Sequence, residues 1–348
     1  MEYDDGSVYD GEWHWDFIHG KGKFIDPEGN VYKGDFAGDS KTGVGELIYK
    51  NGDYYQGDFL LNKKDGKGFL RTKELEYEGQ FQNDHPHGYG EMYFGEGKKM
   101  IYKGEFDRGV KNGKGELVTP EGKKIKTTWV NGKKEGRFVL ETQHGVADGC
   151  FKADELEGDI TTTFHNGDIY IGNSLNEYRE GKGRMIWANH KALESYEGDF
   201  LKNQMHGKGT LKMKNGLVYT GGMVSNKMMG HGKIKSAQFE AEGEFENGAP
   251  KGNFEVKYDN GDIYKGPFTG FKRNGEGSLV KKSGMTYKGG FKANQMSGKG
   301  VLEVNGEKYE GEWIAGKREG KFVMTEEKSG DRFELTYEND VRKSQTKL

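Results

Sequence analysis

The feature that most constrains this chain is a short motif, tyrosine, glycine and an aromatic residue at alternate positions, which recurs about every 23 residues. A glycine follows the aromatic position by seven residues in all fourteen full copies, and a fragment of a fifteenth copy begins at Phe333. Such a period indicates repeated supersecondary units, each contacting mainly its neighbours. Nine clear copies begin at Tyr9, Tyr32, Tyr55, Tyr77, Tyr102, Tyr196, Tyr264, Tyr287 and Tyr309. Weaker copies begin at Ile125, Ala147, Tyr170, Tyr219 and Ala241.

The spacing within one unit predicts a β-hairpin. Residues at alternate positions share one face of a strand, so the motif forms a first strand, and two later glycines with an apolar residue form a second. The polar segment between them predicts a turn of about six residues. Asn51-Gly52 and Asn260-Gly261 predict tight turns between units. The fold class expected is therefore all-β, an elongated, twisted, single-layer antiparallel β-meander of about 14–15 hairpins.

Composition supports a thin core made of rings on bare backbone. The 348 residues include 58 glycines, 20 phenylalanines, 19 tyrosines and 5 tryptophans, and only 5 prolines, which excludes collagen. We expect aromatic rings to cover the strand glycines. The chain shows no long apolar run and no hydrophobic start, so neither a transmembrane helix nor a secretory signal is expected.

The quoted motifs resemble the MORN (membrane occupation and recognition nexus) repeat. Tyr309-Glu310-Gly311-Glu312-Trp313, followed by Gly316 and Gly320, carries the resemblance, as does the copy at Tyr9. It implies hairpin ribbons, frequent self-association and no catalysis by the repeat, and it includes an older proposal of acidic-phospholipid binding. Arrays made almost only of such repeats resemble scaffolds of the protist cortex and of ciliary axonemes. We expect a continuous array over residues 1–337 and a C-terminal tail or cap over 338–348.

One stretch of the array, about residues 125–175, departs from the pattern. Thr127 replaces a motif glycine, Ile160 replaces a second-strand glycine, and Ser174 replaces the aromatic residue. These changes are either tolerated drift, or the mark of a bend or a partner contact.

Residues that often carry chemistry are explained by the repeat itself. His87 precedes the first repeat glycine, as other histidines do, so His85 and His87 are expected to lie at a turn and not at a metal. Carboxylates recur at one position and form a surface row, unlike a buried acid–base pair. Cys150 is the only cysteine, which excludes an intramolecular disulfide and a cysteine zinc site and fits a reducing compartment. We expect no catalytic, cofactor or metal site, and no enzyme.

Charge is organised by the repeat as well. Eight of the fourteen units carry Lys or Arg directly after the first repeat glycine, and an acidic row faces the same side. Opposite charges on neighbouring strands stabilise pairing and limit aggregation of sheet edges. With acids interleaved, attraction to anionic lipid should be weak. A net charge of −3 gives no reason to expect nucleic acid.

These observations predict a non-catalytic structural scaffold, a protein–protein interaction module of a cytoskeletal assembly. The expected location is intracellular, in the ciliary or flagellar axoneme first and the cell cortex second. The alternative is a peripheral phosphoinositide-binding adaptor between membrane and cytoskeleton. Expected partners are other proteins of a cytoskeletal or axonemal complex, with a homodimer and weak acidic-lipid binding left open.

The aromatic–glycine face is the expected interaction surface, because rings offer large contact area at low entropy cost. Its candidate residues are Tyr9, Trp13, Tyr32, Phe36, Tyr55, Phe59, Tyr77, Phe81, Tyr102, Phe106, Tyr196, Phe200, Tyr264, Phe268, Tyr287, Phe291, Tyr309 and Trp313.

Overall fold

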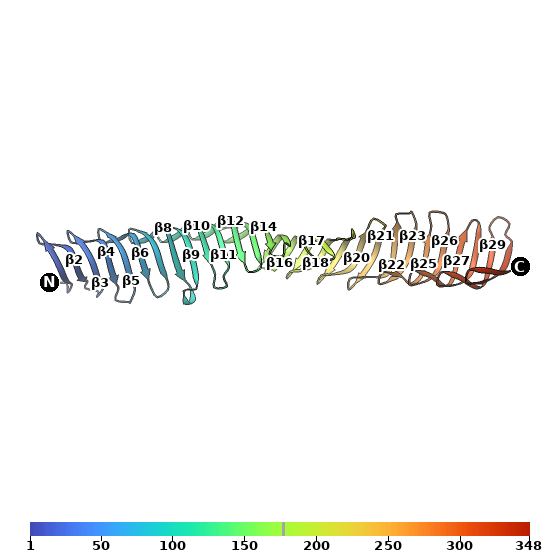
Figure 1. The fold of residues 1–348 in the computed structure, drawn as a ribbon, viewed down its shortest axis with the longest axis horizontal. Coiled ribbons are helices and arrows are strands. Elements are labelled where there is room, and N and C mark those ends of the chain that lie inside the picture. The colour runs from blue at the N-terminus through green and yellow to red at the C-terminus, as the bar shows by residue number, and fades with distance from the viewer. Residues whose placement is uncertain (176–177) are drawn as a thin grey trace. The chain divides into compact units, whose positions relative to one another are not determined.

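The computed structural model describes residues 1–175 and 178–348, and the chain divides into two compact units, Met1–His165 and Asn166–Leu348. Within each unit the strands follow one another in chain order as an antiparallel meander (Figure 1). The expected fold class, an all-β antiparallel meander, is confirmed. The boundary between the units falls inside the irregular stretch 125–175.

The N-terminal unit contains fourteen strands and one short 3₁₀ helix, η1 (Glu96–Lys98). The strands are β1 (Val8–His14), β2 (Phe17–Ile25), β3 (Val31–Ala37), β4 (Ser40–Ile48), β5 (Tyr54–Leu60), β6 (Lys63–Arg71), β7 (Glu76–Gln82), β8 (His85–Phe94), β9 (Met100–Asp107), β10 (Val110–Val118), β11 (Lys124–Val130), β12 (Lys133–Thr142), β13 (Gly145–Lys152) and β14 (Glu155–Phe164).

The described part of the C-terminal unit continues the same alternation of strands. The strands are β15 (Ile169–Leu175), β16 (Tyr178–Ile186), β17 (Leu193–Leu201), β18 (Gln204–Met213), β19 (Val218–Val224), β20 (Lys227–Lys235), β21 (Phe239–Glu246), β22 (Ala249–Tyr258), β23 (Ile263–Thr269), β24 (Lys272–Arg273), β25 (Gly275–Val280), β26 (Thr286–Lys292), β27 (Gln295–Val304), β28 (Glu307–Ile314), β29 (Lys317–Glu326), β30 (Arg332–Glu338) and β31 (Val341–Lys347). Strand β31, in the tail region, pairs with β30.

The turns inside the repeats are shorter than expected. In the first hairpin His14 pairs with Phe17, which leaves Trp15 and Asp16 as the two turn residues, at φ of 53° and 67°. Positive φ at both positions is the geometry of a tight hairpin turn that matches strand twist. The prediction of a six-residue turn is therefore wrong, because the strands extend through the polar positions on both sides of the turn.

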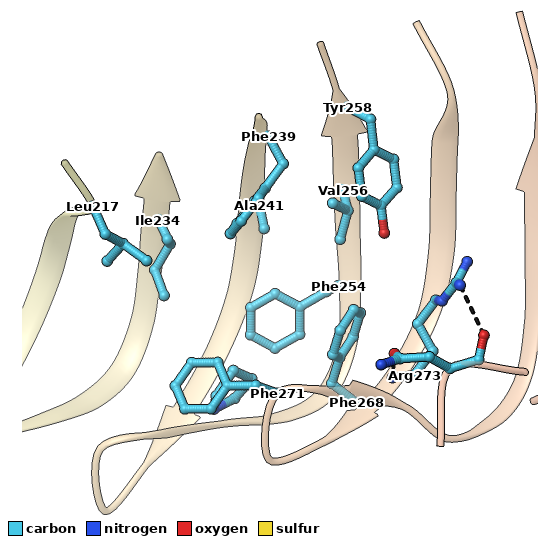
Figure 2. A pocket seen from close by; sticks show the side chains of 12 residues that line it. Leu217, Ile234, Phe239, Ala241, Phe254, Val256, Tyr258, Phe268, Phe271 and Arg273 are labelled. Carbon is cyan, nitrogen blue, oxygen red and sulfur yellow. Dashed lines mark hydrogen bonds between the residues drawn. The ribbon is translucent and has the colours of Figure 1, made fainter. Parts of the chain in front are cut away.

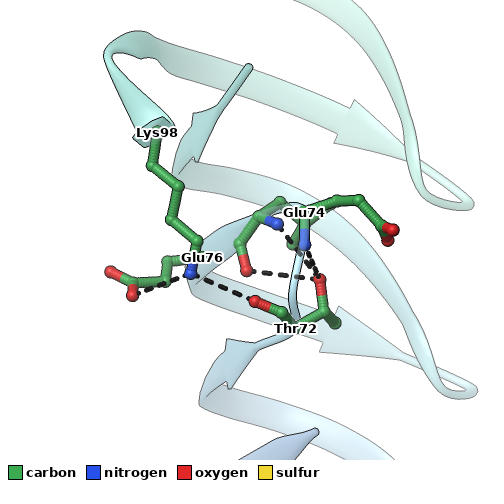
Figure 3. Close-up of polar contacts among 5 residues, drawn as sticks. Thr72, Glu74, Glu76 and Lys98 are labelled. Carbon is green, nitrogen blue, oxygen red and sulfur yellow. Dashed lines mark hydrogen bonds and ion pairs between the residues drawn. The ribbon is translucent and has the colours of Figure 1, made fainter. Parts of the chain in front are cut away.

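The longer connections lie between repeats. Tyr49–Asp53 joins β4 to β5, and Gly52, at a φ of 89°, donates its N–H to the Tyr49 carbonyl at 2.9 Å. Some of these loops contact the preceding loop. Lys98 Nζ donates to the Thr72 carbonyl at 3.1 Å and pairs with Glu76 at 3.0 Å (Figure 3).

The core is a series of interlocking rings lying on glycine backbone. A Cβ built at Gly22 would lie 2.5 Å from the Tyr9 ring, so only glycine admits the ring there. The Tyr9 hydroxyl donates to the Glu12 carbonyl at 2.8 Å, which satisfies the buried phenol. The Phe36 ring meets the rings of Tyr9 and Tyr32 edge-on, at 5.4 and 5.1 Å between centroids. Repetition of these contacts builds the structure that we call the ring ladder, and it confirms the predicted packing of rings on glycine.

Candidate functional site

The rings predicted as an interaction surface form the core. Fifteen of the eighteen candidates are buried, Phe268 and Tyr309 are half-buried, and Trp13 alone is exposed, at 43 %. Because each ring is covered by its own and the next repeat, most of them offer no accessible contact area. The prediction that these rings form the contact surface is therefore corrected: most of them build the core, and the accessible surface is formed by other residues.

The opposite, outer face carries paired charges. Lys21 Nζ lies 2.7 Å from Asp35, and Lys182 Nζ lies 2.6 Å from Asp199 on the next strand. The hydrogen bond from Lys182 holds the pKa of the Asp199 carboxyl below its usual value. The expected alternation of opposite charges is present at these positions, and it leaves these lysines neutralised by their neighbours.

A second set of cations lies on the ring side of the sheet. These residues follow the repeat tyrosine by nine positions, and their charged groups sit over the rings, as Lys41 does over Tyr32 at 5.2 Å. Lys111 Nζ lies 4.1 Å from the Phe94 centroid and 4.9 Å from that of Tyr102. Burial there lowers the pKa of Lys111 to about 8. These cations cover the ring ladder from solvent.

The residue nine positions after the start of a repeat also links successive hairpin turns by hydrogen bonds. Its backbone N–H donates to an Asp or Asn side chain in the next repeat's turn, as Ile18 does to Asp39 at 2.8 Å and Arg273 to Asn294 at 2.8 Å. Pro250 occupies this position in the Ala241 repeat and has no N–H to donate. Phe271 stands at the corresponding place of the next turn, where most other repeats carry Asp, Asn or Gly.

Some repeats replace a strand glycine with a second ring. Phe254 and Phe322 each occupy the position of the second repeat glycine. A Cβ built at Gly243 would lie 2.7 Å from the Phe254 ring, and one at Gly311 would lie 2.5 Å from the Phe322 ring. In these repeats the ring that covers the glycine therefore comes from the second strand. Phe254 joins the ring ladder edge-on, 5.3 Å from Phe245 and 5.5 Å from Phe268.

The Ala241 repeat leaves an apolar groove above that ring, with a volume of about 480 Å³ (Figure 2). Its size lies in the range of ligand-binding pockets. We call it the Ala241 groove, and it is lined by Leu217, Ile234, Phe239, Ala241, Pro250, Phe254, Val256, Tyr258, Phe268, Phe271, Arg273 and Asn294.

Arg273 is the one charged residue among those twelve. Its guanidinium donates to the Asn294 carbonyl at 2.8 Å and lies over the rings of Tyr264 and Phe291 at 5.3 and 5.2 Å. Burial raises the pKa of Tyr264 to about 12, so its phenol stays neutral beside the cation. Among the residues that the structure describes, no carboxylate forms an ion pair with Arg273. The groove therefore combines apolar walls with one unneutralised cation.

The sequence contained a signal for this groove. The weak copy at Ala241 combines alanine in the tyrosine position with Phe254 in a glycine position, and Phe271 follows in the next turn. Together these residues open the groove, but the repeat pattern alone does not show this because it depends on how neighbouring hairpins pack.

Within residues 1–175 and 178–348, no group of three or more His, Cys, Asp or Glu side chains is arranged to hold a metal ion. No helix in the described chain has the length and apolar character needed to cross a bilayer.

The geometry defines a protein of tandem β-hairpin repeats with an aromatic–glycine core. The family model described as "MORN repeat" matches ten segments that together cover more than half of the chain, so the chain belongs to the MORN repeat family. The matched segments are 9–31, 32–54, 55–72, 77–99, 102–124, 170–191, 196–218, 219–238, 287–306 and 309–321. Among the parts left unmatched are residues 125–169 and 239–286, the latter holding the Ala241 and Tyr264 repeats, and the last matched segment ends at the residue before Phe322.

Comparisons with individual proteins are more distant. The chain is 25 % identical to Protein TIC 100 of Arabidopsis thaliana over 182 residues, 49 % of this chain and 20 % of that protein. It is 29 % identical to Alsin of Rattus norvegicus over 159 residues, 42 % of this chain and 9 % of Alsin. The chain thus spans a fifth or less of these curated relatives. Among solved structures, the TCP10 domain of Danio rerio CPAP, in complex with a STIL peptide, matches at 13 % identity and a TM-score of 0.35, covering 66 % of this chain and 93 % of that one.

Proposed function

We propose that the chain is a non-catalytic scaffold that docks other proteins within a cytoskeletal assembly. The observation that carries the proposal is the series of repeats, ten of which match the MORN family model. Each repeat uses its rings to hold its own hairpin on the next one, so the array can present many surface positions on one continuous support. The Ala241 groove is an accessible apolar site of this array.

Within a cytoskeletal assembly, the location that we propose first is the ciliary axoneme, and the second is the cell cortex. It is supported by the resemblance of arrays made almost entirely of MORN repeats to cortical and axonemal scaffolds. Partners would be structural proteins of the same complex, and self-association remains part of the proposal.

The phosphoinositide-adaptor alternative has less support from the geometry. A lipid-binding stripe would use the eight Lys and Arg residues that follow the repeat glycines. Three of them, Lys21, Lys182 and Lys321, are paired with carboxylates 2.6–3.2 Å away. Screening at physiological salt weakens the remaining attraction further.

Fractionation of tagged protein from native ciliated cells tests the proposal. A scaffold stays with the axonemal or cortical pool after detergent extraction, whereas complete release into the soluble pool would overturn the assignment. Flotation with phosphoinositide vesicles, compared with neutral vesicles, tests the alternative, for which binding only to the former would be required.

A further inference from the structure

We propose that the Ala241 groove docks a protein segment that carries one bulky aromatic or aliphatic side chain with an Asp or Glu nearby. The inference rests on the proposed scaffold function and specifies the chemistry of one partner. It is carried by three features of the groove, which are its shape, its charge and its rim.

The shape indicates a ring-sized occupant. The repeat that begins at Tyr309 carries a tyrosine ring at this position of its first strand, whereas Ala241 supplies only a methyl group. Phe254 and Phe268 line the resulting groove in Figure 2. An incoming aromatic side chain can pack edge-on against such rings, the arrangement that this core already uses.

The charge indicates an acidic neighbour to that side chain. The Arg273 guanidinium is held in place by the Asn294 carbonyl and by two rings, and no carboxylate in the described chain forms an ion pair with it. A fixed, partly desolvated guanidinium favours a carboxylate because the hydrogen bonds are charge-assisted and geometrically specific. No acidic residue lines the groove to compete.

The rim makes the groove reachable from solvent. Phe271 is 63 % exposed although its ring lines the groove, and it lies in a turn that Pro250 cannot tie down through an N–H. In protein interfaces, the contacts that surround an anchor side chain exclude water from it. Phe271 stands at the rim of the groove, where it can make such a contact. Phe271 would thus close over the bound side chain.

Selection from a displayed library of random peptides tests the inference directly. The full chain serves as bait, Ala241→Tyr serves as the counter-selection variant, and Ile314→Tyr, which adds a phenol ring at an exposed strand end away from the groove, is the matched control. We expect enriched peptides to combine a Phe, Trp, Tyr or Leu with an adjacent acid. They should bind Ala241→Tyr about 100-fold more weakly than the wild type, as expected for loss of a central anchor, and bind Ile314→Tyr unchanged.

A double-mutant cycle tests the charge separately. Arg273→Gln should weaken a selected peptide about tenfold, and changing the peptide acid to its amide should then cause no further loss. Circular dichroism of each variant checks that the fold is kept.

Three outcomes would overturn the inference: no enrichment, enriched peptides that bind Ala241→Tyr as well as the wild type, or a self-association that only Ala241→Tyr abolishes, which would make a second copy the occupant. If any of these occurs while the protein stays with the axonemal or cortical pool, the inference fails and the scaffold function stands. Complete release from that pool would instead overturn the scaffold function itself.

Discussion

Two repeats of the C-terminal unit, those that begin at Ala241 and Tyr309, share an exchange of glycine for phenylalanine but differ in the residues at three neighbouring positions. In both, a second-strand ring, Phe254 or Phe322, lies on the first-strand glycine. In the later repeat Tyr309 is retained, its hydroxyl donates to Glu307 at 2.6 Å, and the Arg318 guanidinium lies 5.3 Å from its ring. The earlier repeat has Ala241, Phe239 and Pro250 at these three positions.

The comparison shows that the ring lying on the first-strand glycine can come from either strand of a repeat. The Phe322 ring centroid lies 4.8 Å from that of Trp313 and 5.3 Å from that of Tyr337. The ring ladder therefore continues in this repeat, although the ring on the strand glycine is a phenylalanine and not a tyrosine. The tyrosine of this repeat no longer has to supply the ring on glycine, and Tyr309 contacts Glu307 and Arg318 instead. Where that residue is lost, as at Ala241, the ladder persists and a groove opens above it.

The largest expected effect comes from removing the second-strand ring. Phe254→Gly should lower the free energy of unfolding by about 3–5 kcal/mol, the usual cost of deleting a buried phenylalanine, because no other ring can cover Gly243. Phe322→Gly should cost clearly less, since Tyr309 can adopt the pose that Tyr287 has over Gly300. Urea denaturation of the two variants provides the comparison, and equal losses would show that the two repeats do not differ in this way.

A smaller effect is expected when the regular pattern is restored at the first repeat. Ala241→Tyr combined with Phe254→Gly supplies a first-strand ring and a second-strand glycine, as in the clear copies. The double variant should regain most of the stability that Phe254→Gly loses, giving a coupling of about 2–3 kcal/mol in a double-mutant cycle. Additive losses would contradict a shared ring position.

The hydrogen bonds that link successive hairpin turns predict a still smaller difference in stability between the two repeats. Gly316, at a φ of 83°, donates its N–H to the Met296 carbonyl but has no side chain to accept the Met296 N–H. Gly316→Asn should therefore raise stability by about 0.5–1 kcal/mol, as a new side-chain-to-backbone bond does. Phe271→Asn should bring no such gain because Pro250 has no N–H. Thermal unfolding measures both, and a gain at Phe271→Asn would argue against the link.

The smallest effect concerns alkaline pH. Burial first, and the Glu307 hydrogen bond second, raise the pKa of Tyr309 to about 12. Because the folded pKa exceeds the unfolded value near 10, the associated stability is complete below pH 10 and declines as the pH rises toward 12. Glu307→Gln should lower the pKa of Tyr309 in a phenolate absorbance titration measured against the parent chain. An unchanged titration would show that Glu307 has no part in holding the Tyr309 proton.

The period and the residue types were sufficient to predict the hairpins, the rings on glycine and the paired charges of the outer face. They made the turn inside each repeat too long, because the strands extend into the polar segment and the two-residue turns use varied pairs such as Trp15-Asp16 and Leu61-Asn62. The tight turn expected between units at Asn51-Gly52 is present, with Gly52 bonded to the Tyr49 carbonyl. The period and the residue types also treated the rings as an exposed surface, since a strand pattern does not show that the next repeat covers them.

The candidate site depended on information that no single repeat contains. Ala241, Pro250 and Phe271 are unremarkable as separate departures from the pattern, and the groove arises because the three lie together with Phe254 across neighbouring hairpins. The predicted irregular stretch at 125–175 contains the boundary between the two compact units, and a partner contact there stays a prediction.

The central claim is that Ala241, at a position where most repeats carry tyrosine, leaves an apolar vacancy that an aromatic ring can enter. Methyl NMR of the full chain during titration with p-cresol, the tyrosine side chain as a free molecule, tests this directly. We predict saturable shifts of the Ala241 and Val256 methyl signals in the wild type and none at Val256 in Ala241→Tyr, because small apolar molecules bind vacancies of matching shape. Absence of saturable shifts in the wild type, or the same Val256 shifts in Ala241→Tyr, would contradict the account.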